Sequence, residues 1–314
     1  MRIVFCGTPA FAVPSFDELR RQPDFQILAV LTQPDRPRGR GQDLAASAVK
    51  QAALAAGVPV HQPDKVRAPE VQRLLEGLRP DAVVIIAYGQ IVPARLLPIP
   101  KFGWINLHAS LLPKYRGAAP INWAIVQGET RTGVTAMRID AGMDTGDMLL
   151  RRETEIGPSE TAPELAARLA ALGAPLMVET LRRLAAGTLE AERQDHGAAS
   201  YAPVLKRDDG RIDWSLSAQA IFDRIRGFAP WPGAYTTFRG QLCHLWGQPV
   251  SKPDRERPAA GSPGSLAHAN GAVWVVCGDW TLLRLTSVKL AGRKQVSASE
   301  FANGARLASG EFFV

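Results

Sequence analysis

Along the first 90 residues, segments with the hydrophobic pattern of a strand alternate with segments that have the hydrophobic spacing of a helix. Short apolar runs rich in β-branched residues predict strands over Arg2–Cys6, Phe25–Thr32, Val58–His61 and Asp81–Tyr88. Helical spacing between them predicts helices over Phe11–Arg20, Leu44–Ala56 and Ala68–Leu78. This order is typical of crossover helices that join parallel strands, so we expect an α/β, Rossmann-like domain with a mostly parallel sheet.

The pattern changes in the second half of the chain. Helical spacing returns over Thr161–Ala186, and residues 187–210 are polar and mixed, as in a linker. After a helical stretch at Ser217–Phe228, short strands alternate with turn clusters, which is typical of a small β-barrel. We therefore expect a first domain over residues 1–189, a linker over 190–208 and a small OB-like β-barrel domain over 209–314.

Composition narrows the class of protein. A chain of 314 residues exceeds the usual size of one hydrophobic core, and 46% hydrophobic with 21% charged residues is ordinary for a globular protein. Apolar runs such as Ala82–Ala87 are too short to span a bilayer, and the first residues show no signal-peptide pattern. We expect a cytoplasmic protein without membrane contact, and the lack of an exposed apolar stripe suggests a monomer.

Cysteine spacing and charge add two expectations. Cys6, Cys243 and Cys277 are isolated, which supports neither a disulfide framework nor a structural zinc site, so we expect no metal. Residues 1–200 hold 23 basic and 21 acidic side chains, whereas residues 201–314 hold 14 basic and nine acidic side chains. The excess of positive charge in the C-terminal part indicates a polyanionic partner, although it could also serve only solubility.

The densest group of polar candidates stands where a strand gives way to a loop, at Ile105–Pro113. Strand alternation places Asn106 and His108 on one face, and Asp144 lies in a second polar turn after Gly133–Ile139. These residue types suit acyl transfer to an amine. Asn106 can donate to the developing oxyanion, His108 can add positive charge or protonate the leaving nitrogen, and Asp144 can orient the ring.

Other interpretations of the same residues stay open at this point. Taken singly, the three are compatible with a hydrogen-bonded core histidine, a turn asparagine and an Asx-turn aspartate. A hydrolase using Ser110 is disfavoured, because no GxSxG pattern surrounds it. The first turn, Gly7-Thr8-Pro9, lacks the GxGxxG pattern, which disfavours a dinucleotide cofactor.

Asn106-Leu107-His108, Ser110–Pro113 and Gly142–Gly146 together resemble the signature of the folate-dependent formyltransferase family. The resemblance implies that Asn106, His108 and Asp144 are catalytic and that 10-formyltetrahydrofolate is the co-substrate that donates the formyl group. It also implies folate contacts from three loops, with the residues Ser110, Leu111, Leu112, Pro113, Ala87, Tyr88, Gly89, Gln90, Ile91, Ile139, Asp140, Ala141, Gly142 and Met143.

The resemblance extends over essentially the whole chain to the branch of this family that acts on initiator methionyl-tRNA. Gly7-Thr8-Pro9, Arg211–Trp214 and Pro230–Ala234 match that branch, and so does the inserted loop Gln33–Gln42. The loop implies tRNA contacts from Arg36, Arg38 and Arg40. Gln42-Asp43 and Val204 stand where the branch often has lysines. We therefore expect further contacts at Lys206, Arg207, Arg293 and Lys294.

Two other functions compete with this interpretation. A formyltransferase for an amino-sugar nucleotide has a similar two-domain layout and an anionic acceptor. A non-catalytic RNA-binding protein on the same scaffold would have no use for Asn106, His108 and Asp144.

Overall fold

The computed structural model describes residues 1–38, 43–250, 261–269, 271–308 and 310–314. The chain forms two compact units. The first comprises Met1–Pro120, Arg131–Glu155 and Glu164–Pro203, and the second comprises Ile121–Thr130, Ile156–Pro163 and Val204–Val314. A single cut in the sequence therefore does not separate them.

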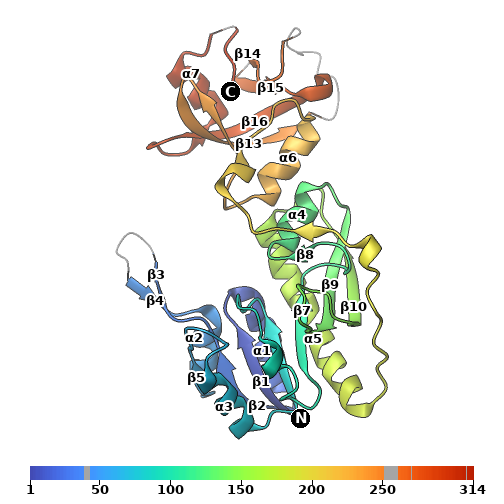
Figure 1. Ribbon diagram of the computed structural model, residues 1–314. Helices are drawn as coiled ribbons and strands as arrows, with labels where there is room; N and C mark the ends of the chain where they lie inside the picture. Colours follow the sequence, from blue (N-terminus) through green and yellow to red (C-terminus); the bar gives the residue numbers. More distant parts are fainter. Residues whose placement is uncertain (39–42, 251–260, 270, 309) are drawn as a thin grey trace. The chain divides into compact units, whose positions relative to one another are not determined.

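The first unit is built on a seven-stranded sheet with the order β10-β9-β7-β6-β1-β2-β5 (Figure 1). Five neighbouring strands are parallel: β7 (Trp104–His108), β6 (Ala82–Ile86), β1 (Arg2–Gly7), β2 (Gln26–Leu31) and β5 (Val60–His61). At one edge, β9 (Arg131–Arg138) and β10 (Met148–Glu155) run antiparallel. The prediction of a Rossmann-like, mostly parallel sheet is confirmed.

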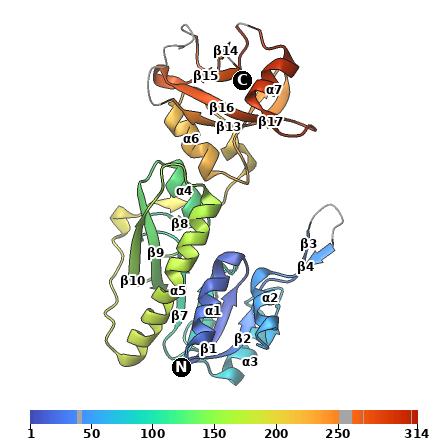
Figure 2. The ribbon, with the colours of Figure 1, turned by 180° about the vertical axis from the view of Figure 1, so that it is seen from behind.

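Helices cover both faces of this sheet because alternate strand residues are apolar on both sides. Phe5 of β1 packs edge-on against Phe16 of α1 (Val13–Arg21), whereas its neighbours Val4 and Cys6 pack with Val71 of α3 (Pro69–Leu78) on the other face. Figure 2 shows α5 (Ala162–Ala186) over the same face as α1.

The stretch Leu44–Ala56 departs from the prediction of one helix. The helix α2 covers only Ala48–Ala55, and its N-cap is Ser47, whose Oγ accepts a hydrogen bond from the Lys50 backbone N–H at 3.0 Å. Before it, β4 (Asp43–Ala45) pairs antiparallel with β3 (Arg36–Arg38), so the inserted segment is a β-hairpin. Residues 39–42, between the two strands, lie outside the described residues.

The second unit contains an antiparallel sheet, as the strand pattern predicts. Its order is β12 (Tyr235–Phe238), β13 (Gln241–Pro249), β16 (Leu282–Leu290), β15 (Ala272–Val276) and β14 (Leu266–Ala269), with β17 (Val296–Ser297) beside β16. The C-terminal residues bond to both edge strands, because Val314 exchanges two backbone hydrogen bonds with Thr237 of β12 and the Glu311 carbonyl accepts from the Leu266 N–H of β14. This segment closes the sheet on itself.

Two helices and two outlying segments complete the second unit. Apolar side chains of α6 (Ala218–Gly227) and α7 (Ala298–Ala305) belong to the same core as the strands. The buried Arg226 pairs with Asp223 at 2.7 Å and donates to the carbonyls of Gly157 and Glu160. Asn122 of α4 (Pro120–Val126) donates to the Gly227 carbonyl at 2.7 Å. These bonds hold residues 121–130 and 156–163 to α6.

None of the helices in the described ranges is long and apolar enough to cross a membrane.

Candidate active site

Strand β7 carries Asn106 and His108 to its carboxyl end. Asn106 aligns with Ile85 of β6 on one side and with Met137 of β9 on the other, so the strand is fixed from both edges. Asn106 is half-buried, and its side-chain amide makes no hydrogen bond to any residue that the structure describes. Such an amide is available to donate to a substrate oxygen.

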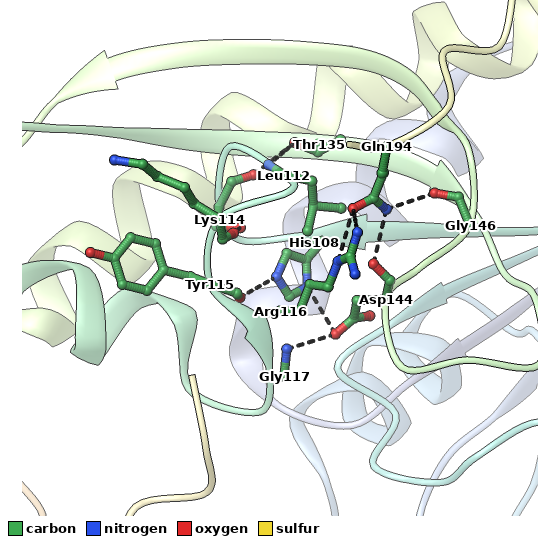
Figure 3. A network of polar contacts seen from close by, with 11 residues as sticks. His108, Leu112, Lys114, Tyr115, Arg116, Gly117, Thr135, Asp144, Gly146 and Gln194 are labelled. Carbon is green, nitrogen blue, oxygen red and sulfur yellow. Dashed lines mark hydrogen bonds and ion pairs between the residues drawn. The ribbon is translucent and has the colours of Figure 1, made fainter. Parts of the chain in front are cut away.

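The His108 ring is buried and engaged on both nitrogens (Figure 3). Its Nε2–H donates to the Tyr115 carbonyl oxygen at 2.9 Å, and its Nδ1 lies 3.6 Å from Oδ2 of Asp144. Both neighbours are oxygen atoms that can accept a hydrogen bond from the ring. The two contacts therefore fix the orientation of the His108 ring.

Asp144 is held in a restricted conformation. Its φ is 52°, in the left-handed region, where a residue other than glycine loses roughly 1–3 kcal/mol unless its surroundings hold it there. The Gly117 backbone N–H donates to its Oδ2 at 2.9 Å, the same oxygen that faces His108. The carboxylate is thereby fixed toward the histidine ring.

The loop Ser110–Pro113 is tied to β9. Thr135 Oγ1 donates to the Ser110 carbonyl at 2.7 Å and accepts from the Leu112 N–H at 3.3 Å. Ser110 Oγ donates to the Lys114 carbonyl at 2.6 Å, and Leu112 is buried against Met137 and Met148. Because the serine hydroxyl points to a backbone carbonyl in its own loop, the geometry does not support Ser110 as a nucleophile.

The predicted folate loop Ala87–Ile91 follows β6. The Tyr88 ring is buried, and burial raises the pKa of its phenol above the usual value. The Tyr88 carbonyl accepts from Thr8 Oγ1 and Gln33 Nε2, and the Gln90 side chain bonds to Val66 N–H and the Asp64 carbonyl. The Tyr88 and Gln90 side chains thus support the protein itself, whereas Ile91 is 84% exposed.

The loop Ile139–Met143 starts beside the beginning of β7, where the Ile139 N–H donates to the Trp104 carbonyl at 2.9 Å. The Asp140 carboxylate accepts from the Gly142 N–H and from Thr145 Oγ1, so it stabilises its own turn. Met143 is exposed and apolar. The loop then returns Asp144 to the end of β7.

A cavity of about 620 Å³ opens at the carboxyl ends of β1, β2 and β6. Its lining includes Thr8, Gln33, Ser47, the predicted folate residues Ala87–Gly89, and Arg36 of the inserted hairpin. Residues expected at the folate and residues expected at the tRNA therefore meet in one cavity.

The base of the hairpin is anchored by Asp35. Its carboxylate accepts from Lys50 Nζ at 2.5 Å and from Gln62 Nε2 at 2.8 Å. The Lys50 ammonium, with the Gln62 amide, holds the pKa of Asp35 below its usual range. The anchor therefore stays ionised at neutral pH.

The predicted tRNA contacts fall into three groups. Arg36 is exposed at the start of the hairpin, whereas the Arg38 side chain and the whole of Arg40 lie outside the described residues. In the second unit, Lys206, Arg207, Arg293 and Lys294 are all exposed. Lys206 and Arg207 lie at the start of a short 3-10 helix, and Arg293 and Lys294 lie in the turn between β16 and β17.

The sequence analysis missed Arg116 and Gln194. The buried Arg116 donates from Nε and Nη2 to Gln194 Oε1 at 3.0 and 2.8 Å. Gln194 Nε2 donates to the carbonyls of Asp144 and Gly146 at 2.9 and 2.7 Å. A single glutamine in a polar stretch carries no periodic signal that would have revealed this role.

The part of the chain that the structure describes holds no group of three or more His, Cys, Asp or Glu side chains suited to a metal ion.

Comparison with known proteins decides the family. Residues 1–181 match the model of the formyl transferase family, and residues 204–306 match that of the formyl transferase C-terminal domain. The chain belongs to the formyl transferase family.

Curated members of the family align with nearly the whole chain. A methionyl-tRNA formyltransferase from Solibacter usitatus is 56% identical over 99% of this chain and 98% of its own length. One from Acidobacterium capsulatum is 49% identical over 98% of both.

Solved structures share the fold at low identity. An N-formyltransferase from Helicobacter canadensis, in complex with folinic acid and dTDP-3-aminofucose, aligns with a TM-score of 0.64 at 18% identity, over 90% of this chain and 97% of that one. A glycinamide ribonucleotide transformylase from Symbiobacterium toebii aligns with a TM-score of 0.52 at 22% identity, over 62% of this chain and 94% of that one.

Proposed function

We propose that this formyltransferase moves the formyl group of 10-formyltetrahydrofolate onto the amino group of methionine carried by initiator tRNA. The observation that carries the proposal is the 56% identity, over 99% of the chain, to a protein named methionyl-tRNA formyltransferase. The free amide of Asn106, close along β7 to the buried His108 that faces Asp144, supports the same chemistry.

Each of the three side chains has a separate part in the proposed transfer. As the amine attacks the formyl carbon, the formyl oxygen gains negative charge, and Asn106 donates a hydrogen bond to it. When protonated, His108 stabilises the same oxygen or protonates the leaving nitrogen, and Asp144 keeps the ring oriented. The new nitrogen–carbon bond forms, the bond to the donor nitrogen breaks, and the proton lost by the amine is taken up by that nitrogen.

The residues around the trio fit a donor of this kind. Ile91 and Met143 offer exposed apolar side chains, whereas the Tyr88 and Gln90 side chains are bonded or buried within the protein. In this proposal the polar part of the donor is therefore bound by backbone groups of Ala87–Ile91, Ser110–Pro113 and Ile139–Met143. No covalent enzyme intermediate is required, because the amine attacks the formyl carbon directly. Ser110 Oγ bonds to the Lys114 carbonyl and has no part in this step.

The tRNA acceptor requires a basic surface, and in this proposal catalysis and tRNA binding belong to different parts of the chain. Residues 1–189 form the catalytic domain, residues 190–208 form the linker, and residues 209–314 with Lys206 and Arg207 bind the tRNA. The charge excess in residues 201–314 supports this division. The hairpin residues Arg36, Arg38 and Arg40 contact the acceptor end of the tRNA in this proposal.

A panel of acceptors tests the function. The purified enzyme and 10-formyltetrahydrofolate are offered methionyl initiator tRNA, a dTDP-amino sugar or glycinamide ribonucleotide, and kcat/KM is measured for each. We expect kcat/KM for methionyl-tRNA to exceed that for either small amine by at least about a thousandfold, because neither amine makes the contacts for which the site is built. A higher kcat/KM for the amino sugar would replace the proposed acceptor by a sugar nucleotide.

A further inference from the structure

We propose that Gln194, held in place by Arg116, is a positioning residue that sets the catalytic geometry of Asp144. The inference rests on the proposed function, in which Asp144 orients His108. It assigns a role to a side chain that lies outside the three loops and the trio.

Gln194 uses both ends of its amide at the site (Figure 3). Its nitrogen donates to the carbonyls of Asp144 and Gly146, which flank Thr145 in the catalytic loop. Its oxygen accepts two hydrogen bonds from the Arg116 guanidinium, whose remaining Nη1 donates to His196 Nδ1 at 3.2 Å. Both Gln194 and Arg116 are more than nine-tenths buried, so the amide cannot rotate into water.

Asp144 needs such a hold because its backbone is in the left-handed region, where a residue other than glycine stays only if its surroundings hold it there. Gln194 fixes the carbonyl of Asp144, and the Gly117 N–H fixes its Oδ2. With backbone and carboxylate both bound, the 3.6 Å approach to His108 Nδ1 is maintained. Without Gln194, the Gly117 bond and the His108 contact would still hold the carboxylate, but the Asp144 carbonyl would lose its donor.

The same stretch of chain also fixes the second partner of His108. Ser200 Oγ accepts from the Tyr115 N–H at 2.9 Å, and the Ser200 carbonyl accepts from the Arg116 N–H at 2.8 Å. Directly after it, β11 (Tyr201–Ala202) pairs with β8 (Arg116–Gly117). The Tyr115 carbonyl that accepts from His108 is thus placed by residues 200–202, while Asp144 is placed by Gln194.

A purely structural role for Gln194, as a partner for a buried arginine, is the competing explanation. Gln194→Glu separates the two roles, because the carboxylate still accepts from Arg116 but can no longer donate to the two loop carbonyls. We expect kcat to fall on the order of ten- to a hundredfold, with KM for folate and for tRNA within about twofold. Thr180→Val, which removes a buried hydrogen bond of α5, is the control and should leave kcat unchanged.

A double-mutant cycle with Asp144→Asn supplies the readout that a structural role would not give. If Gln194 acts through Asp144, Gln194→Glu should not slow Asp144→Asn any further. Arg116→Lys, which keeps the charge but loses the two-pronged contact, should behave in the same way and decides the question if Gln194→Glu does not fold.

Unchanged kcat in Gln194→Glu, or losses that multiply in the double variant, would overturn the inference. Failure of the proposed function looks different, because the unmodified enzyme would then not formylate methionyl-tRNA at all.

Discussion

Asn106 and His108 lie two residues apart on one strand, yet their surroundings prepare them for different tasks. The Asn106 amide has no bond to the described residues, whereas both nitrogens of His108 already face acceptors. Asn106 is therefore free to bind the reacting oxygen, and the His108 ring is fixed in its orientation in advance. Because neither has to reorganise during the reaction, their stabilisation acts mainly on the transition state.

The first prediction concerns the loss of either group. We expect Asn106→Ala or His108→Ala to lower single-turnover transfer by a factor on the order of a hundred or more, with tRNA and folate affinity nearly intact. Asn303→Ala, at an exposed position of α7, is the matched control and should retain the wild-type rate. Near-wild-type turnover of both active-site variants would show that the catalytic assignment is wrong.

The second prediction isolates the charge of Asp144. Asn tolerates the left-handed conformation and can still accept from Gly117, so Asp144→Asn should fold and bind both substrates normally. Turnover should drop by roughly a thousandfold or more, because a neutral amide cannot stabilise positive charge that the reaction places on the His108 ring. Asp147→Asn makes the same charge change in the same loop and should remain active; equal losses in the two variants would argue against a specific role for Asp144.

At the scale of elements, the hairpin β3–β4 depends on the anchor at Asp35. Asp35→Ala removes the acceptor for Lys50 and Gln62, so the hairpin should lose its position while the sheet stays intact. We expect kcat/KM for methionyl-tRNA to fall roughly tenfold and folate affinity to stay unchanged.

Lys50→Ala should reproduce that effect, and Asp17→Ala, which breaks an ion pair on α1, should not. A loss of folate affinity in Asp35→Ala would mean that the hairpin belongs to the donor pocket.

Elements with a clear period were predictable from the sequence. The buried run Ala82–Ile86 and the helix Ala162–Ala186 match the predicted strand and helix closely, because burial on defined faces dictates their patterns. The stretch before α2 was mispredicted as helix. Ala-rich sequence has high helix propensity, but pairing with Arg36–Arg38 makes Asp43–Ala45 a strand and leaves Leu44 71% exposed.

The candidate site likewise contains residues that could be predicted from the sequence and residues that could not. Asn106 and His108 could be paired from strand alternation alone, because their relation is local. The contact between Arg116 and Gln194 joins positions 78 residues apart, and one amide in a polar stretch leaves no pattern. Long-range polar contacts of this kind become visible only when tertiary packing brings the segments together.

For the molecule as a whole, the basic charge of residues 201–314 predicts that the affinity for tRNA depends on salt. Binding of tRNA should weaken steeply as salt rises, because phosphate contacts release counterions, whereas folate binding should change much less. Replacing Arg293 and Lys294 together by Ala should reduce the slope of log Kd against log salt by roughly one to two.

Arg20→Ala with Arg21→Ala removes the same charge from α1 and serves as the control. An unchanged slope in the Arg293/Lys294 variant would exclude those residues from the tRNA contact. Charge variants suit this question better than truncation, because a fragment ending at residue 200 would strip residues 121–130 and 156–163 of their partners in α6.

In the proposed reaction, the site with Asn106, His108 and Asp144 transfers the formyl group directly to methionyl-tRNA. A rapid-quench experiment with donor labelled in the formyl carbon follows the label over one turnover. We predict that the label leaves the folate and appears on the amino group of the methionyl-tRNA at the same rate, with none on the protein, and that both rates collapse together in His108→Ala. Label trapped on the protein, or donor consumed without formylated methionyl-tRNA, would contradict the account.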